Sequence, residues 1–298
     1  MALRVAVANH KGGVGKSTTS MMLAEGLAYG HGLRALVIDF DPQSSLSAML
    51  LSAQGAQEVG VKGRTLWHLL RAVSDGKPIQ LSKYVTTKVS DIAELRDASD
   101  QRRVDLIASR SSLLTDTHEI EDALRRRYRN VRTDAAIANA LAGELALLDR
   151  NYDVIIFDCP AGPATLALTA IRLSQVVLAP TALDDISLRA LSDFVKIILS
   201  QDLGVYGHLL DFKVLITMFL RTNTEQRRLF DQITSGVYSL NALPRPVTHS
   251  VQVQRAVSRL RPDSYRSARE KYGDALDDLV ALASSIYSIN QPAIKATA

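Results

Sequence analysis

Residues 10–18 of this 298-residue chain read HKGGVGKST, a glycine-rich loop that holds two lysines and two hydroxyl side chains. An apolar run, Leu3 to Ala8, precedes the loop, and a helical pattern from Ser20 to Tyr29 follows it. Glycines let a backbone turn tightly, so that successive N–H groups face an anion. The start of a helix points further unpaired N–H groups and a positive dipole end at the same place. The pattern predicts a phosphate-binding loop between a buried strand and a helix.

The side chains of this loop fit a nucleoside triphosphate bound with Mg²⁺. Lys16 supplies a positive charge for the β- and γ-phosphates, and Ser17 supplies a hydroxyl for Mg²⁺. His10 stands where the usual GxxxxGK[ST] pattern has its first glycine, and Lys11 adds a second lysine directly after it. A glycine turn between core elements is the structural alternative, and strand, loop and helix in this order argue against it. The loop residues expected to bind the nucleotide are Lys11, Gly12, Gly13, Val14, Gly15, Lys16, Ser17 and Thr18.

Two more apolar runs end in carboxylates. Leu33–Phe40 leads into Asp39 and Asp41, and Tyr152–Phe157 leads into Asp158. Open α/β sheets bind ligands at the carboxyl ends of their strands, and the alternation of side chains along a strand predicts that Asp39 and Asp41 share a face. An aspartate after a hydrophobic strand is typical of the Mg²⁺-holding residue of a phosphoryl-transfer site. Each aspartate alone could be a turn former or a helix cap, but their order after the loop favours one site.

These motifs resemble those of one family. The loop resembles the deviant Walker A motif of the ParA/MinD family of P-loop ATPases, DFDPQ at 39–43 resembles its second signature, and DCPAG at 158–162 resembles its switch II signature. The second proline of that last signature is replaced by Ala161 here. The resemblance implies ATP and Mg²⁺ as cofactors. Since none of the motif residues is a strong base or an arginine finger, we expect slow, partner-stimulated hydrolysis.

The resemblance also implies roles for single residues. Lys11 would reach across a homodimer to the partner's nucleotide, Asp41 would orient the attacking water, and Asp39 would support it near Mg²⁺. The catalytic residues expected are Lys11, Lys16, Asp39 and Asp41, and the metal ligands expected are Ser17, Asp39 and Asp158.

Length and composition favour one large α/β domain over residues 1–288, followed by a C-terminal tail at 289–298. The chain has 47% apolar residues. It lacks an apolar run of about eighteen residues and a basic-then-apolar leader, so we expect it in the cytoplasm. The family resemblance further implies that it associates with the nucleoid. Its one cysteine, Cys159, is expected to pack in the core. One cysteine is too few for the iron–sulfur cluster of the related nitrogenase iron protein.

Apolar runs alternate with helical segments, which predicts a doubly wound, mostly parallel sheet flanked by helices. Residues 55–63 read as a turn-rich connection, and Thr222 with Glu225 reads as a capping box. The strands expected are 3–8, 33–40, 83–88, 104–108, 152–157, 175–180 and 212–218. The helices expected are 20–29, 44–51, 65–73, 112–129, 133–150, 164–173, 184–200, 223–235 and two more at the C-terminus.

The stretch from Arg245 to Lys271 holds seven basic residues against two acidic ones. Arginines 255 and 259 are four apart on one expected helix, and arginines 266 and 269 are three apart on the next, so each pair should share a helix face. Such a surface suits phosphate backbones without reading base sequence, although a merely solvated basic face is the alternative. A second cluster at 125–132 is better explained as favourable charge at a helix end.

The family resemblance implies that ATP-bound dimers bind double-stranded DNA nonspecifically through the first of these surfaces. It places Pro244 near adenine and gives the segment Met218–Asn223 a part in recognising the base. The DNA-binding residues expected are Arg245, Arg255, Arg259, Arg266 and Arg269.

Four classes of function are compatible with the motifs. They are a DNA-segregation ATPase with a ParB-like partner, a MinD-like membrane-cycling ATPase, an accessory ATPase that positions a non-DNA cargo such as a secretion or polysaccharide-synthesis complex, and a metabolic P-loop enzyme. A membrane-cycling protein needs a basic amphipathic C-terminal helix, whereas residues 273–287 carry three aspartates on the polar side. A metabolic enzyme would not need the basic stretch. We therefore expect plasmid or chromosome partition, without membrane binding and without an operator-binding helix-turn-helix before the loop, and the accessory ATPase is the alternative.

Overall fold

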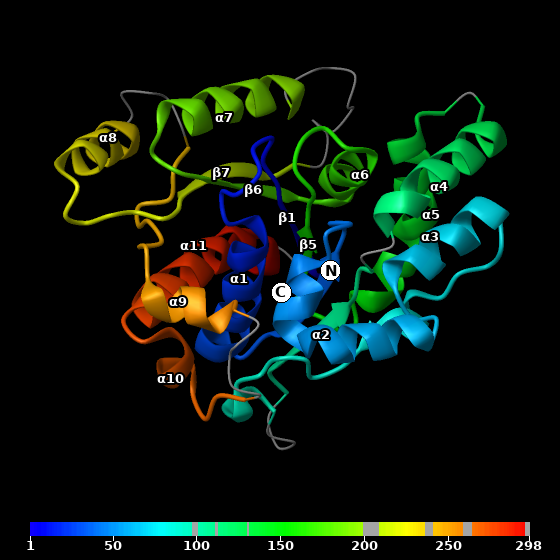
Figure 1. Cartoon of the computed structure of the whole chain (residues 1–298), viewed down its shortest axis with the longest axis horizontal. Coiled ribbons are helices and arrows are strands. Elements are labelled where there is room, and N and C mark those ends of the chain that lie inside the picture. Colours follow the sequence, from blue (N-terminus) through cyan, green and yellow to red (C-terminus); the bar gives the residue numbers. More distant parts are fainter. Residues whose placement is uncertain are drawn as a thin grey trace.

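The computed structural model describes residues 1–96, 101–110, 113–129, 131–198, 209–235, 241–258 and 264–295. Within them, seven strands form one sheet in the order β3-β4-β2-β5-β1-β6-β7 (Figure 1). All neighbouring strands are parallel except β3 and β4, which confirms the expected mostly parallel sheet. The strands are β1 (Leu3–Val7), β2 (Arg34–Asp39), β3 (Val85–Thr86), β4 (Arg103–Ile107), β5 (Val154–Asp158), β6 (Val176–Thr181) and β7 (Asp211–Ile216).

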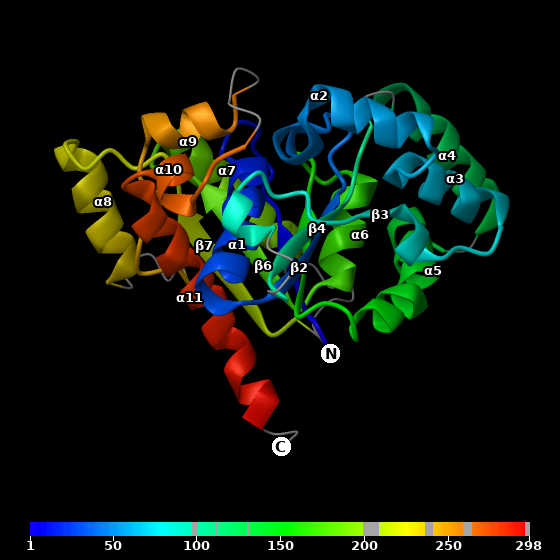
Figure 2. The same cartoon turned by 90° about the horizontal axis from the view of Figure 1, so that it is seen from below.

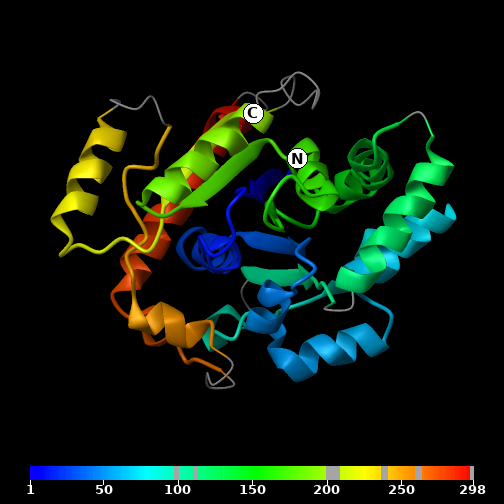
Figure 3. The same cartoon turned by 45° about the horizontal axis from the view of Figure 1, so that its top comes forward.

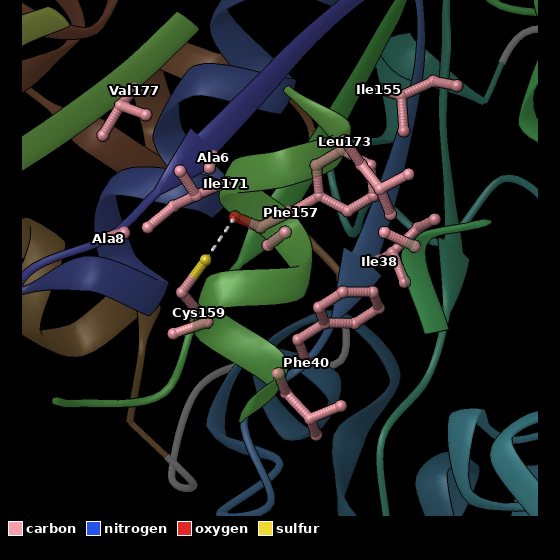
Figure 4. Packing of buried hydrophobic residues seen from close by; sticks show 14 of the residues in the cluster. Ala6, Ala8, Ile38, Phe40, Ile155, Phe157, Cys159, Ile171, Leu173 and Val177 are labelled. Atoms are coloured by element: carbon pink, nitrogen blue, oxygen red, sulfur yellow. Dashed lines mark hydrogen bonds between the residues drawn. The ribbon is translucent and has the colours of Figure 1, made fainter. Parts of the chain in front are cut away.

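Helices cover both faces of the sheet, because consecutive residues of the central strands are apolar and their side chains point alternately to the two faces. On β5, Val154 and Ile156 join one core with residues of α1 and α11, whereas Ile155 and Phe157 join the other core with residues of α5, α6 and α7. Figure 4 shows Phe157 in the second core, beside Phe40 and the buried Cys159. The helices are α1 (Lys16–His31), α2 (Ser45–Val61), α3 (Leu66–Asp75), α4 (Leu113–Arg127), α5 (Thr133–Leu148), α6 (Thr165–Leu173), α7 (Asp185–Ile198), α8 (Thr224–Thr234), α9 (Val251–Ala256), α10 (Ala268–Tyr272) and α11 (Ala275–Lys295).

Six of the described helices form two groups on opposite sides of the molecule. α3, α4 and α5 lie together beyond β3 and β4, and α8, α9 and α10 lie at the other end (Figure 3). α11 packs along α1 and then extends past the rest of the molecule toward the C-terminus (Figure 2). It runs to Lys295, so the helix continues into the segment 289–298 that the sequence suggested as a tail. None of the helices in the described ranges is both long and apolar enough to cross a membrane.

Some local expectations were wrong. α2 continues to Val61 past a kink at Ser52, so most of the 55–63 segment is helical rather than a turn-rich connection. Asn223, not Thr222, caps α8, because its side chain accepts hydrogen bonds from the backbone N–H groups of Glu225 and Gln226. β2 ends at Asp39, and the chain then turns, so strand alternation does not set the position of Asp41.

Candidate nucleotide site

The glycine-rich loop joins the end of β1 to the start of α1 at the centre of the sheet. Gly13 and Gly15 have φ values of 75° and 82°, a left-handed conformation that glycine adopts without steric cost. A Cβ placed on Gly12 or Gly13 would have no described atom within 4 Å, so the loop is open on that side. α1 begins at Lys16 rather than at Ser20 as expected. Residues 16–18 therefore form the first helical turn, whose free N–H groups can bind an anion.

Two side chains fasten the loop to the neighbouring strands. The Asn9 side chain donates a hydrogen bond to the Pro180 carbonyl (2.7 Å), and the Thr217 hydroxyl donates one to the Val14 carbonyl (3.0 Å). Lys16 lies inside the loop and donates from Nζ to the Lys11 carbonyl (3.0 Å). Burial lowers the pKa of Lys16, and the negative charges of nearby aspartates oppose that shift. A phosphate beside this ammonium would favour the charged form of Lys16 and so raise its pKa again.

The two strand-end aspartates meet because β2 and β5 are neighbours and pair Asp39 with Asp158. Asp158 is fully buried, and its Oδ1 accepts a hydrogen bond from Ser20 Oγ (2.8 Å). The Ser17 side chain lies near this carboxylate and acts to lower its pKa. Its Oδ2 is buried without a hydrogen-bond partner among the described residues. Burial raises the pKa of Asp158 to about 7.

A buried carboxylate oxygen without a partner is what a bound cation would satisfy. Ser17 and Asp158 therefore fit Mg²⁺. Among the residues that the structure describes, no group of three or more His, Cys, Asp or Glu side chains could hold a metal ion. Proteins usually hold the Mg²⁺ of a bound nucleotide with one or two side chains, water and the phosphates.

Asp39 supports Asp41 directly. Its Oδ1 accepts from the Asp41 backbone N–H (3.1 Å), and its Oδ2 accepts from both the backbone N–H (2.9 Å) and the hydroxyl (2.6 Å) of Ser47. Burial, together with the charge of Asp158, raises the pKa of Asp39 well above its usual range. Asp41 is half-buried, accepts from the Gln43 N–H (2.8 Å), and has a pKa raised by burial. These contacts agree with Asp39 as the supporting carboxylate, and its direct contact with Mg²⁺ stays a prediction.

Lys11 turns toward its own chain in this structure. Its Nζ donates to Ser187 Oγ (2.8 Å) and lies 3.2 Å from Asp184 Oδ1. Asp184 accepts in turn from the backbone N–H (2.8 Å) and hydroxyl (2.6 Å) of Ser187 at the start of α7. The role of Lys11 across a dimer stays a prediction, and that role requires this contact to open.

The segment expected to recognise the base borders the loop. The Met218 methyl carbon would lie 3.9 Å from a Cβ at Gly15, and Met218 has the unusual φ of 54°. The Phe219 N–H donates to the Val247 carbonyl (3.1 Å), which joins this segment to the chain after Pro244. Pro244 is exposed, and its place near adenine stays a prediction.

The basic stretch is divided between surface and core. Arg255 on α9, Arg245 before it and Arg269 on α10 are exposed. Arg266 is exposed but precedes α10, because Ser267 caps that helix, so the expectation that Arg266 and Arg269 share a helix face was wrong. Arg259 lies outside the described residues.

Lys271, counted with this stretch in the sequence, belongs to the core. Its Nζ lies 3.0 Å from both carboxylate oxygens of Glu25 and 2.5 Å from Asp91 Oδ1, and its side chain is 0% exposed. The Tyr272 hydroxyl also donates to Glu25 (2.6 Å). This buried ionic network, Glu25, Asp91 and Lys271, ties α10 to the helix that follows the loop.

Sequence reasoning missed the partners of the expected site residues. Ser20 binds Asp158, Ser47 binds Asp39, and Asp184 with Ser187 binds Lys11. Three of these partners are 8, 138 and 173 residues from the residue they bind. Asp184 itself offered a signal, because it comes three residues after an apolar strand.

The chain is similar to known proteins over most of its length. A protein-family model described as "AAA domain" matches residues 3–202. The sporulation initiation inhibitor protein Soj of Bacillus subtilis is 29% identical over 74% of this chain, and the match covers 74% of Soj. The chromosome partitioning protein ParA of Myxococcus xanthus is 28% identical over 72% of this chain.

Some relatives are longer than the matched region. A relative from Rhizobium rhizogenes, named as a replication protein, is 30% identical over 85% of this chain, yet the match spans 59% of that relative, and it spans 64% of the Myxococcus protein. The chain thus spans less than two thirds of these two proteins.

Two solved structures show the same fold. One is a plasmid partition protein of Borrelia burgdorferi bound to AMPPNP, with a TM-score of 0.71 and 17% identity over 96% of this chain and 98% of that chain. The other is apo McdA of Cyanothece, with a TM-score of 0.69 and 18% identity over 96% of this chain and 100% of that chain.

Proposed function

Because the chain belongs to the ParA/MinD family of P-loop ATPases, we propose that it dimerises on binding ATP, binds double-stranded DNA nonspecifically and drives plasmid or chromosome partition. In this proposal a ParB-like partner stimulates hydrolysis and releases the dimer from DNA. Such a protein would work in the cytoplasm on the nucleoid. The observation that carries the ATPase part is the meeting of the glycine loop, Lys16 and the unpartnered Asp158 oxygen at the ends of neighbouring strands.

Binding of ATP depends on the loop and the first turn of α1. The N–H groups of residues 12–18 would face the phosphates, and Lys16 would move from the Lys11 carbonyl to the β- and γ-phosphates. Ser17 and Asp158 would hold Mg²⁺, which supplies charge neutralisation at the phosphates. Phosphoryl transfer depends mainly on such positioning and charge.

Hydrolysis needs a positioned water, and Asp41 is the residue proposed to orient it. Asp39 holds the Asp41 backbone in place, and Ser47 holds Asp39. Lys11 would complete the site of the partner subunit once it leaves Asp184 and Ser187. Because both lysines come from one loop, nucleotide binding and dimer formation would be linked.

The DNA-binding part is supported by the names of the relatives and by the exposed arginines near α9 and α10. Two subunits present twice as many phosphate contacts as one, so ATP-driven dimerisation should raise DNA affinity. The second candidate function is an accessory ATPase of the same fold that positions a non-DNA cargo.

One experiment separates the two functions. Binding of fluorescent duplex DNA of arbitrary sequence is measured over a salt series, with a non-hydrolysable ATP analogue, with ADP, or without nucleotide. If the protein acts in DNA partition, the ATP analogue should raise its affinity for DNA, and added salt should lower that affinity steeply. Replacing Arg255 and Arg259 with Ala should flatten the salt dependence by up to about two contacts per protomer, without changing nucleotide binding.

The matched control is Arg125→Ala on α4, which removes an exposed arginine at the opposite end of the sheet (Figure 3). It should leave the salt dependence unchanged. DNA binding that ignores the nucleotide, or no DNA binding, would favour the accessory ATPase.

A further inference from the structure

One buried carboxylate gathers two arginines at the surface. Asp278, on α11, has a side chain that is 1% exposed. Its Oδ1 lies 3.3 Å from Arg245 Nε and 3.5 Å from a terminal nitrogen of Arg221. Its Oδ2 accepts from the backbone N–H (3.0 Å) and the hydroxyl (2.5 Å) of Thr248. Asp278 therefore joins the loop after β7 to the loop before α9.

The two guanidinium groups keep most of their donors available. The Arg221 and Arg245 side chains are 68% and 47% exposed. Each contact with Asp278 uses one nitrogen, whereas a guanidinium group carries five N–H donors. The two guanidinium groups and the one carboxylate together also carry a net positive charge. A pair of outward guanidinium groups is well suited to phosphate oxygens, which accept several hydrogen bonds at once.

The position of the pair connects the nucleotide loop with the basic surface. Arg221 follows Met218, which packs near Gly15, and Phe219 forms a bridge with Thr248. Arg245 and Thr248 lead directly into α9, which carries Arg255. The pair thus links the segment beside the glycine-rich loop to the chain that leads into α9.

We propose that Arg221 is a further DNA-phosphate contact and that Asp278 is the positioning residue that holds Arg221 and Arg245 as one phosphate-binding pair. This inference rests on the proposed DNA binding. Ordering a long arginine side chain costs conformational entropy, and a carboxylate that holds two of them before DNA arrives lowers that cost. The alternative is that Asp278 only cancels positive charge on the DNA-binding surface. In that case, removing its charge would strengthen DNA binding.

The first test replaces Asp278 with Asn and measures DNA affinity with the non-hydrolysable ATP analogue. The variant gains one positive charge per protomer, yet the positioning role predicts that its affinity falls about threefold to tenfold at ~0.1 M salt. Asp274→Asn is the matched control, because it makes the same charge change at an exposed residue just before α11. Asp274→Asn should not weaken binding. Stronger binding by Asp278→Asn would overturn the proposal.

The second test does not depend on the folding of a core variant, because Arg221 is exposed. Arg221→Gln, measured with the ATP analogue at saturating concentration, should lower the slope of log DNA affinity against log salt by about one contact per protomer. Arg125→Gln, on α4, should leave the slope as in the wild type. An unchanged slope for Arg221→Gln would overturn the proposal. If the wild type itself showed no ATP-dependent DNA binding, the proposed function would fail instead.

Discussion

Lys11 and Lys16 stand in the same loop, but their ammonium groups have different partners. Lys16 is buried inside the loop, whereas Lys11 reaches outward to Asp184 and Ser187. Lys16→Ala should therefore abolish ATP binding, because it removes the one buried positive charge at the phosphate position. Lys11→Ala should leave some ATP binding and prevent ATP-dependent dimerisation and hydrolysis. Titration with a fluorescent nucleotide and light scattering with the non-hydrolysable analogue measure the two effects.

Asp184→Ala is the control for the Lys11 experiment. It removes the carboxylate that holds Lys11 in its own protomer without touching the loop, so dimerisation should remain. A Lys11→Ala protein that dimerised like the wild type would contradict the role of this lysine across the dimer.

The raised pKa of Asp158 makes stability depend on pH in the absence of Mg²⁺. The carboxyl group binds its proton more tightly in the folded chain than in the unfolded chain, whose pKa is near the ordinary value of 3.8. Between these values only the folded state keeps the proton, so the free energy of unfolding falls as pH rises from about 4 to about 7. Asp158→Asn should remove this contribution. We expect the variant to melt at a higher temperature than the wild type at pH 8 in EDTA, while hydrolysis is lost.

The difference between wild type and variant is the quantity to measure, by thermal unfolding from pH 5 to pH 8.5. Burial lowers the pKa of His31 and His68, and those shifts act in the opposite direction in both proteins. Mg²⁺ with ATP should reduce the difference by stabilising the wild type. Equal pH dependence in the two proteins would contradict the assignment of the shift to Asp158.

At the scale of elements, α1 and α11 cross closely at Gly26. A Cβ on Gly26 would lie 2.8 Å from a Leu279 methyl carbon, 3.0 Å from the Leu279 carbonyl oxygen and 3.1 Å from Ala283 Cβ. Because the carbonyl belongs to the helix backbone, the two helices would have to separate. Gly26→Ala should cost about 1–3 kcal/mol of unfolding free energy, measured by urea denaturation.

Gly30 in the same helix is the matched control, since a Cβ there would meet no described atom within 4 Å. Gly30→Ala should be neutral or stabilise the chain by up to about 1 kcal/mol, because alanine favours the helix. If both substitutions had the same effect, close packing of α1 on α11 would not be the cause.

At the scale of the whole molecule, the buried ionic network connects three distant parts of the chain. Lys271→Met should lower the unfolding free energy by about 3–5 kcal/mol, because it leaves Glu25 and Asp91 buried without their cation. Replacing all three residues together, with Gln, Asn and Met, should recover part of that loss. Lys77→Met, at an exposed lysine, should change stability by less than about 0.5 kcal/mol. A Lys271→Met protein as stable as the wild type in urea would contradict the network's role.

The sequence predicted the parts of the fold and site that local residues determine. The loop, the strand ends at Asp39 and Asp158 and the mostly parallel sheet could be predicted, because glycine spacing and apolar runs act over a few residues. Lys271 could not be placed, because a lysine is buried only when distant carboxylates compensate its charge. The contacts of Asp278 could not be predicted either, because its two arginines come from separate loops. Nor could the start of α10, where Ser267 caps the helix and leaves Arg266 outside it.

The network of Glu25, Asp91 and Lys271 also sets an order of events during synthesis. A ribosome makes the two carboxylates long before it makes the lysine, which follows Asp91 by 180 residues. Until α10 has left the exit tunnel, any nascent chain that closed this core would enclose two negative charges without a counterion, which is strongly unfavourable. The side of α1 that α10 and α11 cover in the finished protein should therefore stay open to water through most of translation. The packing of α11 on α1 can therefore be completed only when almost the whole chain has been synthesised.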